Sequence, residues 1–305
     1  MPELKKPVIA IVGPTATGKT RRAVDVARAL GGEIISADSR QVYRGMDLGT
    51  GKDIEEYGEI KAHLLDVVDA GEKYNLYQFL SQARAAITDI TARGAWPVVC
   101  GGTGLYVESL LKGMILPQVP ENRELRDSLE GKSLDELTHI LAAMKPLHNV
   151  TDIDTAKRAV RAIEIQTYYL DHPDEAKAAN DPQPLPAVVA GIAIDRDTRR
   201  SRITARLTAR LENGMVDEVR RLLDSGIPAE DLIYYGLEYK YLTLYCIGQI
   251  TYAQMLQELE IAIHQFAKRQ MTWFRGMEKR GFRINWLPHD MPADEFVDAI
   301  KQLLP

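Results

Sequence analysis

The feature that most constrains this chain is a glycine-rich segment directly after a short apolar run. Residues 13–20 read Gly-Pro-Thr-Ala-Thr-Gly-Lys-Thr and match G-x-x-x-x-G-K-[ST] at every fixed position, immediately after Val8–Val12. Between a strand and a helix, this pattern forms a phosphate-binding loop, or P-loop, whose backbone amides surround a phosphate group. Apolar residues at helical spacing from Ala23 to Leu30 supply the helix. The sequence therefore predicts binding of a phosphate or diphosphate group.

The residue types of the loop indicate how it binds. Its glycines let the backbone curl, Lys19 places positive charge beside the outer phosphates, and the Thr20 hydroxyl is a candidate ligand for Mg²⁺, which we expect as the cofactor. The alternative is a glycine turn with an incidental lysine. The expected phosphate-binding residues are Gly13, Pro14, Thr15, Ala16, Thr17, Gly18, Lys19 and Thr20.

Strand and helix patterns alternate through the first 110 residues, which is typical of a parallel sheet with helical crossovers. Strands are expected at Val8–Val12, Glu33–Ala37, Leu64–Val68 and Pro97–Cys100, and helices at Tyr77–Arg93 and Leu105–Leu111. We therefore predict an α/β protein whose P-loop NTPase-like parallel sheet is flanked by helices.

The pattern changes after residue 115. From Leu116 to about Pro186 the chain shows no strand pattern. Helical stretches are expected at Arg123–Leu129, Leu134–Met144 and Thr155–Leu170, followed by the Pro/Asp-rich segment Asp171–Pro186. A central strand is expected at Ala187–Ile194, and the remainder is expected to be helical, with Tyr252–Lys279 the longest helix. We predict a discontinuous core, 1–115 and 187–305, with an inserted all-helical module, 116–186.

Composition limits the possible partners and compartments. The net charge of −5 argues against nucleic acid, but 196–221 holds eight arginines against four acids, and 264–283 holds six Lys/Arg against Glu278. Such basic helices track a polyphosphate backbone or form a solvated face. Cys100 and Cys246 form no C-x-x-C pair, and no apolar stretch approaches the roughly 20 residues of a membrane span. We expect a cytoplasmic protein that does not associate with a membrane.

Two further segments follow expected strands, where ligands bind in open parallel sheets. Asp38 begins the segment Asp-Ser-Arg-Gln-Val-Tyr, and three roles are open to it: a Mg²⁺ ligand, a general base or a helix N-cap. The turn Gly101–Gly104 allows close backbone approach, and Thr103 offers a hydroxyl there. A tight turn without a ligand is the alternative for this segment.

Four motifs in order resemble one known family. They are Gly13–Thr20, Asp38–Asp47, Gly101–Tyr106 and Lys268–Arg275, and together they look like the tRNA dimethylallyltransferase (isopentenyltransferase) family over almost the whole chain. The resemblance implies transfer of a dimethylallyl group from dimethylallyl diphosphate to N6 of the adenosine that follows the anticodon in tRNA, with release of diphosphate. The P-loop would then hold a leaving group.

The resemblance also implies catalytic roles. Asp38 matches the family's candidate base for the amine proton, and Thr103 matches a threonine near the reacting groups. Arg206, eight residues before Gly214, matches an arginine that grips the diphosphate, and its forked, permanently charged head suits two phosphate oxygens. Without the resemblance, Arg206 reads as a surface arginine on a basic helix.

For tRNA contacts, the resemblance points to three places in the chain. Ser39, Arg40 and Gln41 lie in the loop after Asp38, and Arg158 and Arg161 lie in the insertion, where the family has its anticodon-stem module. The basic segment near the C-terminus supplies Lys268, Arg269, Gln270, Trp273 and Arg275, although at helical spacing Trp273 also suits a core position. We expect the chain to act on tRNA as a monomer.

Three alternatives share parts of this pattern. A small-molecule kinase uses the same loop and Mg²⁺; a nucleotide-gated RNA-binding protein has no covalent chemistry; and an adenylate isopentenyltransferase leaves the insertion unexplained. The chain also departs from the family's pattern at His148–Arg158, Gly236–Lys240 and Arg210, where methionine is common. These departures bear on tRNA contacts rather than on the donor site.

Overall fold

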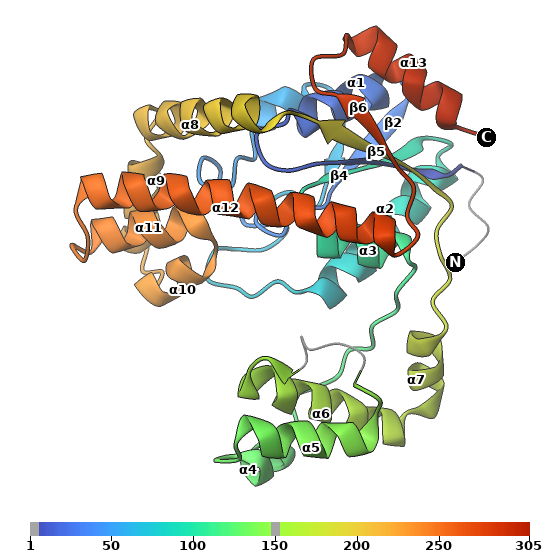
Figure 1. The fold of residues 1–305 in the computed structure, drawn as a ribbon, viewed down its shortest axis with the longest axis vertical. Helices are drawn as coiled ribbons and strands as arrows, with labels where there is room; N and C mark the ends of the chain where they lie inside the picture. The colour runs from blue at the N-terminus through green and yellow to red at the C-terminus, as the bar shows by residue number, and fades with distance from the viewer. Residues whose placement is uncertain (1–5, 148–152) are drawn as a thin grey trace. The chain divides into compact units, whose positions relative to one another are not determined.

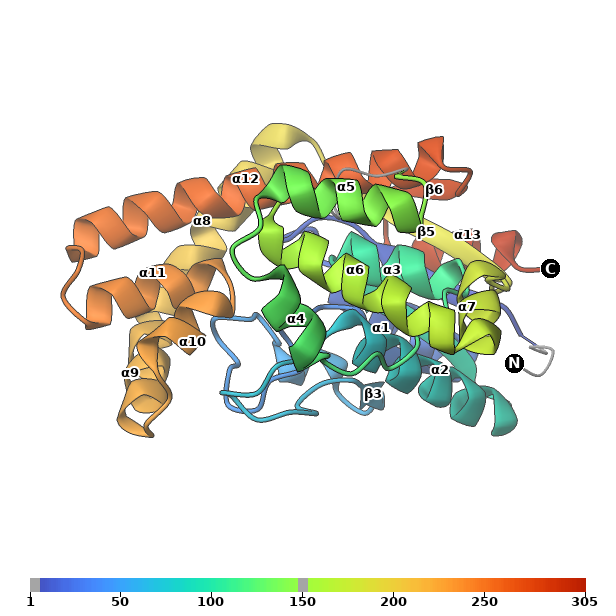
Figure 2. The ribbon, with the colours of Figure 1, turned by 90° about the horizontal axis from the view of Figure 1, so that it is seen from below.

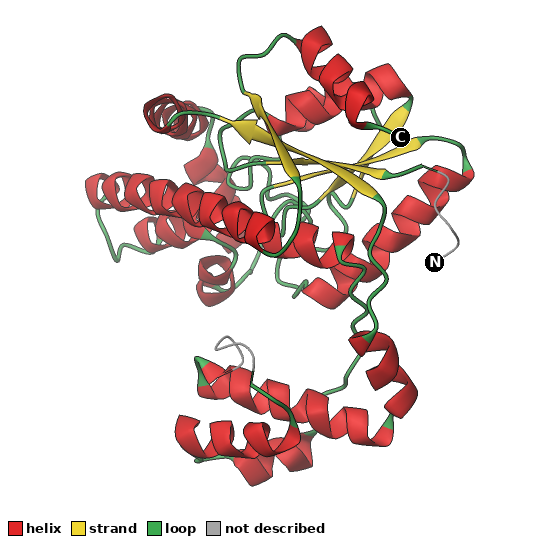
Figure 3. Ribbon diagram, turned by 45° about the vertical axis from the view of Figure 1, so that its right-hand side comes forward, coloured by secondary structure: helices red, strands yellow, loops and turns green. Residues whose placement is uncertain are grey.

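We analysed a computed structural model of the chain, which describes residues 6–147 and 153–305. Its centre is a six-stranded parallel sheet in the order β3-β2-β4-β1-β5-β6 (Figure 3). Strand β1 (Val8–Val12) is fully buried and pairs with β4 (Trp96–Gly101) and β5 (Ala187–Ala193). Strand β2 (Gly32–Ser36) pairs with β4 and with β3 (Ala62–His63), and β6 (Ile284–Pro288) pairs with β5. The predicted fold class is confirmed.

Helices cover both faces of this sheet (Figure 1). On one face, α1 (Lys19–Leu30) and α13 (Ala293–Leu303) pack in a core that includes Ile9, Ile34 and Phe296. On the other lie α2 (Leu76–Ala92), started by a capping box between Asn75 and Gln78, and α3 (Gly104–Leu111).

A set of helices completes this unit. It contains α8 (Arg196–Glu212), α9 (Met215–Asp224), α10 (Ala229–Tyr234), α11 (Leu237–Cys246) and α12 (Tyr252–Lys279). A short 3₁₀ turn, η1 (Ile54–Tyr57), lies after β2. Helix α12 packs against α3, α8 and α11, and thereby connects the helical set to the sheet. Among the described residues, no helix is both long and apolar enough to cross a membrane.

The chain divides into two compact units, residues 1–113 with 184–305, and residues 114–183. The smaller unit contains α4 (Arg123–Leu129), α5 (Leu134–Met144), α6 (Ala156–Asp171) and α7 (Pro173–Asn180) (Figure 2). Helices α5 and α6 pack on a small core around Leu137, Leu141 and Ile163. Its described residues contain no strand, as expected.

Two expectations about elements are wrong, and one helix was not foreseen. The expected strand at Leu64–Val68 is a loop, because Leu64 (φ 63°) and Asp66 (φ 53°) adopt left-handed backbone and the ladder with β2 ends at His63. An isolated bridge joins Val68 of this loop to Tyr43. The segment Asp171–Pro186 contains α7, which begins with Pro173 at its first turn, where proline is tolerated. Strand β6 interrupts the helices expected after Ile194, and it is short and only partly buried, so its apolar signal is weak.

Candidate active site

A pocket of about 690 Å³ opens at the carboxyl edge of the sheet. Since β1, β2 and β4 are parallel neighbours, the loops that follow them meet at this edge. These loops bring the P-loop, the Asp38 segment and the Gly101–Gly104 turn together, and α8, α11 and α12 complete the wall. Site residues predicted from sequence that line the pocket are Thr15, Ala16, Gly18, Lys19, Thr20, Asp38, Ser39, Arg40, Gln41, Thr103, Arg206, Arg269, Gln270 and Trp273.

The P-loop has the strained backbone that such loops need. Gly18 caps α1 in a left-handed conformation (φ 84°), and Ala16 has φ 62°, which is uncommon for a residue with a side chain. Gly13, Pro14 and Thr17 belong to the loop but do not line the pocket. The buried Thr17 hydroxyl donates to the Pro14 carbonyl at 2.9 Å and so stabilises the loop internally. The Lys19 ammonium also donates to this carbonyl, at 2.9 Å, and burial lowers the pKa of Lys19.

Arg206 points from α8 to the P-loop. Asp195 caps the start of α8 by accepting from the amides of Asp197 and Thr198. Three turns on, the Arg206 guanidinium donates to the Thr15 hydroxyl. Burial lowers the pKa of Arg206 to about 10, so the side chain stays charged at neutral pH. The structure thus places two cations, Lys19 and Arg206, beside the phosphate loop.

Asp38 lines the same pocket from the loop after β2. Its Oδ1 accepts from the Arg40 amide at 3.1 Å, and residues 38–53 contain no helix, so the N-cap role is wrong. The Thr103 hydroxyl accepts from the Ser39 amide at 3.1 Å and so fixes the loop from the Gly101–Gly104 turn. Gln41 donates to the Gly51 carbonyl at 3.0 Å and therefore serves as an internal brace of the pocket wall.

The basic C-terminal segment divides between the pocket and the surface. Arg269 and Trp273 line the pocket, and 39% of Trp273 remains exposed, so the core position is excluded for it. Lys268 and Arg275 are exposed on α12 and do not line the pocket. Gln270 is buried and faces inward. The segment thus presents different residues to the site and to solvent.

Arg158 and Arg161 lie in the smaller unit. Arg158 pairs with Asp154, and Arg161 pairs with the buried Glu164 and donates to the Val119 carbonyl at 2.8 Å. Glu164 also accepts from Arg126 at 3.0 Å. Arg161 therefore has a structural role in this unit, and tRNA binding by both arginines remains a prediction.

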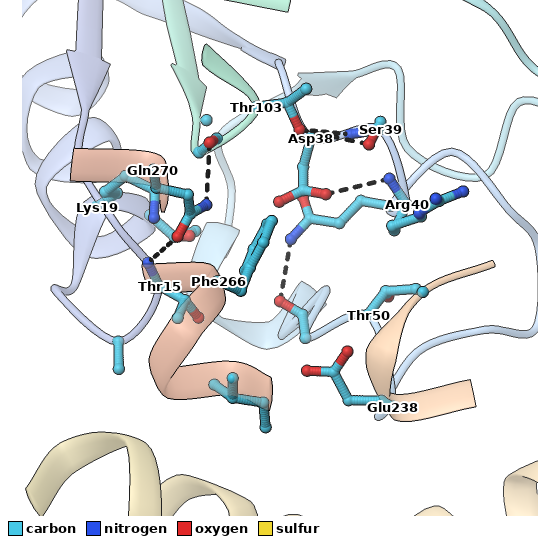
Figure 4. Close-up of a pocket in the computed structure, with 18 of the residues that line it drawn as sticks. Thr15, Lys19, Asp38, Ser39, Arg40, Thr50, Thr103, Glu238, Phe266 and Gln270 are labelled. Atoms are coloured by element: carbon cyan, nitrogen blue, oxygen red, sulfur yellow. Dashed lines mark hydrogen bonds between the residues drawn. The ribbon is translucent and has the colours of Figure 1, made fainter. Parts of the chain in front are cut away.

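Sequence reasoning missed a second wall of the pocket, made by residues 49–53 and 235–239. Arg210 donates to both carboxylate oxygens of Asp53 (2.8 and 3.1 Å) and packs on Gly51. Glu238 lines the pocket as well, and burial raises its pKa. Figure 4 shows Glu238 and Thr50 across the pocket from Lys19. The departures from the family's pattern at Arg210 and at 236–240 were the available signal.

Residues 47–53 are held in place by two buried charges. Glu218 of α9 accepts from the amides of Asp47, Leu48 and Gly49 at 2.8–3.0 Å, and from the Tyr239 hydroxyl at 2.6 Å. The fully buried Lys52 ammonium pairs with Asp47 at 2.6 Å and with Asp66, and donates to the Tyr43 carbonyl at 2.8 Å. These contacts give the loop one defined conformation.

Fold and site together define an α/β protein with a P-loop motif, in which the cations of Lys19 and Arg206 share one pocket with the Asp38 carboxylate. The comparisons with known proteins give its family. The family model described as IPP transferase matches residues 41–277, and the one described as isopentenyl transferase matches residues 6–62. The chain belongs to the IPP transferase family.

Named relatives agree with this assignment. The chain is 58% identical over 300 residues to tRNA dimethylallyltransferase 1 of Porphyromonas gingivalis, covering 97% of this chain and 98% of the relative. The crystal structure of the tRNA isopentenylpyrophosphate transferase of Bacillus halodurans matches with a TM-score of 0.71 at 32% identity, covering 98% and 95% of the two chains. A eukaryotic dimethylallyltransferase acting on tRNA has a TM-score of 0.81 at 23% identity, covering 98% and 79%, and supports the fold.

Proposed function

We propose that this chain transfers the dimethylallyl group of dimethylallyl diphosphate to N6 of the adenosine 3′ to the anticodon in tRNA. The observation that carries the proposal is one pocket that the P-loop, Arg206 and Asp38 line together. In the reaction the carbon–oxygen bond to diphosphate breaks, a carbon–nitrogen bond to N6 forms, and N6 loses a proton. The site therefore needs cations that bind the diphosphate and a base that takes the proton. Lys19 and Arg206 are the cations and Asp38 is the base, and they come from different segments of the chain.

At the donor end, Lys19, Arg206 and the P-loop amides stabilise the charge that grows on the departing diphosphate. Both cations are partly buried, where electrostatic interactions are stronger than in water. Arg206 already contacts Thr15, so its guanidinium is positioned before the donor binds. Pre-positioned charges need little reorganisation during the reaction.

We propose Mg²⁺ as the cofactor of this site, with the Thr20 hydroxyl as its protein ligand. The described residues contain no group of three or more Asp, Glu, His or Cys side chains that could hold a metal ion. This fits Mg²⁺, which is often held by few protein groups together with the oxygens of substrate phosphates. When bound, the ion supplies further positive charge to the leaving diphosphate.

At the acceptor end, Asp38 accepts the N6 proton. The Arg40 amide fixes one carboxylate oxygen, and Thr103 fixes the neighbouring Ser39, so the carboxylate has a defined direction. The adenosine must leave its stack to reach the pocket, which costs least in an unpaired anticodon loop. Ser39, Arg40 and the exposed ring of Trp273 are the groups we assign to the flipped base and its neighbours.

For tRNA binding outside the pocket, we assign Lys268 on α12, Arg275 near its end, and Arg158 and Arg161 in the smaller unit. Arg269 lines the pocket, and we assign it to tRNA contacts there. Lys268, Arg275 and Arg158 are exposed, as phosphate contacts require. We further propose that the protein acts as a monomer. Cys100 and Cys246 are both free, which fits the reducing cytoplasm we propose as its location.

One assay separates this proposal from a kinase, an adenylate prenyltransferase and a non-catalytic RNA-binding protein. Purified protein is incubated with Mg²⁺ and dimethylallyl diphosphate, and diphosphate release is followed with and without tRNA. A parallel reaction contains ATP, and its hydrolysis is followed in the same way. We expect release with tRNA, and none when AMP replaces it. Turnover of ATP, transfer to AMP, or no diphosphate release with tRNA would contradict the proposal.

A further inference from the structure

The Gln270 side chain joins two loops of the pocket that come from opposite ends of the chain. Its Oε1 accepts from the Thr15 amide of the P-loop at 2.8 Å, and its Nε2 donates to the Gly102 carbonyl at 2.9 Å. Figure 4 shows the amide between these two groups. Only 6% of Gln270 is exposed, so its donor and acceptor ends are both committed inside the protein.

The Gly101–Gly104 turn is pressed against α12 at this point. A Cβ added to Gly102 would collide with the Gln270 amide, and one added to Gly104 would collide with the Trp273 ring. The Arg280 guanidinium forms a bidentate pair with the buried Glu108 (both contacts 2.6 Å), which fastens the end of α12 to α3 directly after the turn. The turn and α12 therefore form one closely packed structure, in which Gln270 has little freedom to move.

Hydrogen bonds continue from both ends of the Gln270 amide. At the P-loop end, the Thr15 hydroxyl also accepts a hydrogen bond from Arg206. At the other end, Gly102 is followed by Thr103, whose hydroxyl accepts from the Ser39 amide next to Asp38. Gln270 thus stands between the group that grips diphosphate and the loop that carries the base.

We propose that Gln270 is a positioning residue that sets the P-loop relative to the Asp38 loop, and that it makes no contact with tRNA. The proposal rests on the proposed function, because the two loops must present donor and acceptor to each other. Correct placement of reacting groups contributes much of an enzyme's rate, and small displacements are costly. Losing the Gln270 amide leaves the Thr15 amide and the Gly102 carbonyl without their partner.

The test compares three variants. Gln270→Met keeps the approximate size of the side chain and loses both hydrogen bonds. Gln270→Glu keeps the acceptor for Thr15 and loses the donor to Gly102, so it remains informative if the methionine variant does not fold. Gln265→Met is the matched control, because Gln265 is exposed on the same helix. Three quantities are measured: affinity for inorganic diphosphate with Mg²⁺ by calorimetry, affinity for tRNA by filter binding, and kcat with the KM for donor. The melting temperature of each variant is recorded beside them as a measure of its stability.

For Gln270→Met we expect diphosphate affinity and kcat each to fall about tenfold or more, because an unpaired buried amide lets the loop relax. tRNA affinity should stay within about twofold of wild type. Gln270→Glu should lower kcat, and Gln265→Met should change none of the three quantities.

Three results would overturn the proposal. Weaker tRNA binding with unchanged diphosphate affinity would make Gln270 a tRNA contact. A lower melting temperature with unchanged diphosphate affinity and kcat would make its role merely structural, and no change at all would leave it no role. If wild type binds diphosphate but does not prenylate tRNA, the proposed function fails, while the diphosphate affinities of the variants still decide whether Gln270 positions the P-loop.

Discussion

Asp38 and Glu238 both line the pocket, and their surroundings differ. Asp38 is oriented by a backbone amide in the loop after β2. Glu238 comes from the start of α11, where burial raises its pKa while Arg206 and Arg210 partly offset that effect. Two carboxylates in one site can thus have separate roles, because their local contacts differ.

Replacing Asp38 tests the base directly. Asp38→Asn keeps the shape of the side chain and removes its ability to take the N6 proton. We expect kcat to fall by about 10²–10⁴-fold, the usual contribution of a positioned base, with tRNA affinity near that of wild type. Single-turnover transfer and filter binding measure the two effects, and full activity in this variant would remove Asp38 from the chemistry.

The raised pKa of Glu238 predicts how the stability of the protein depends on pH. Its native pKa lies above the ordinary value of 4.5, so the native state binds this proton more tightly than the unfolded chain. The free energy of unfolding therefore falls as pH rises from 4.5 through the native pKa. Glu238→Gln removes this dependence, and its melting temperature should exceed that of wild type by an amount that grows over this range and then levels off. Thermal melts of both proteins from pH 4.5 to 8 measure the difference; a constant difference would contradict the assignment.

At the scale of elements, the loop at 47–53 shows how α9 contributes to a site it does not line. Glu218 is 3% exposed and accepts three successive amides of this loop together with the Tyr239 hydroxyl. Arg210 of α8 holds the same loop through Asp53. The loop in turn braces Gln41 through the Gly51 carbonyl. Buried charges on two helices therefore determine the shape of the second wall.

We expect Glu218→Gln to destabilise the protein by about 1.5–3 kcal/mol, because an amide replaces a charged acceptor and its NH₂ faces donors. Urea unfolding measures the loss. Glu212→Gln is the control, since Glu212 is exposed at the end of α8. An equal effect in both variants would show that Glu218 does not hold the loop.

Elements with strong local signals were predictable, and those that depend on distant contacts were not. The bounds of β1, α4, α5 and α12 are confirmed, because apolar spacing and end signals agree there. The motifs placed the P-loop, Asp38, Thr103 and Arg206 around one pocket, and the structure brings them together. The second wall was missed because the burial of Lys52, Glu218 and Glu238 arises from packing between helices and a loop far apart in sequence.

At the scale of the whole molecule, the chain interrupts its α/β unit with a helical one. The ends of the α/β unit that flank the insertion meet in a hydrogen bond from the Leu185 amide to the Leu111 carbonyl at 2.9 Å. The smaller unit has its own core. The insertion therefore adds a separate compact body, while the two flanking ends of the α/β unit stay next to each other.

Deleting residues 114–183 tests the role of that body. Because Leu111 and Leu185 are hydrogen-bonded, a short Gly/Ser linker can close the gap. We expect the shortened chain to fold and to bind inorganic diphosphate with Mg²⁺ as wild type does, with tRNA affinity and modification lost. Calorimetry, filter binding and transfer assays measure these effects, and efficient modification of tRNA by the shortened chain would show that the insertion does not bind it.

The central claim is that the P-loop holds a diphosphate that is discarded while its prenyl group passes to tRNA. The most direct test is mass spectrometry of nucleosides and of ribonuclease fragments from unmodified tRNA incubated with the protein, dimethylallyl diphosphate and Mg²⁺. We expect one new nucleoside, N6-dimethylallyladenosine, in the fragment that carries the adenosine next to the anticodon, and we expect it to be absent when the Asp38→Asn variant is used. Unmodified adenosine at that position after incubation with active, folded protein would contradict it.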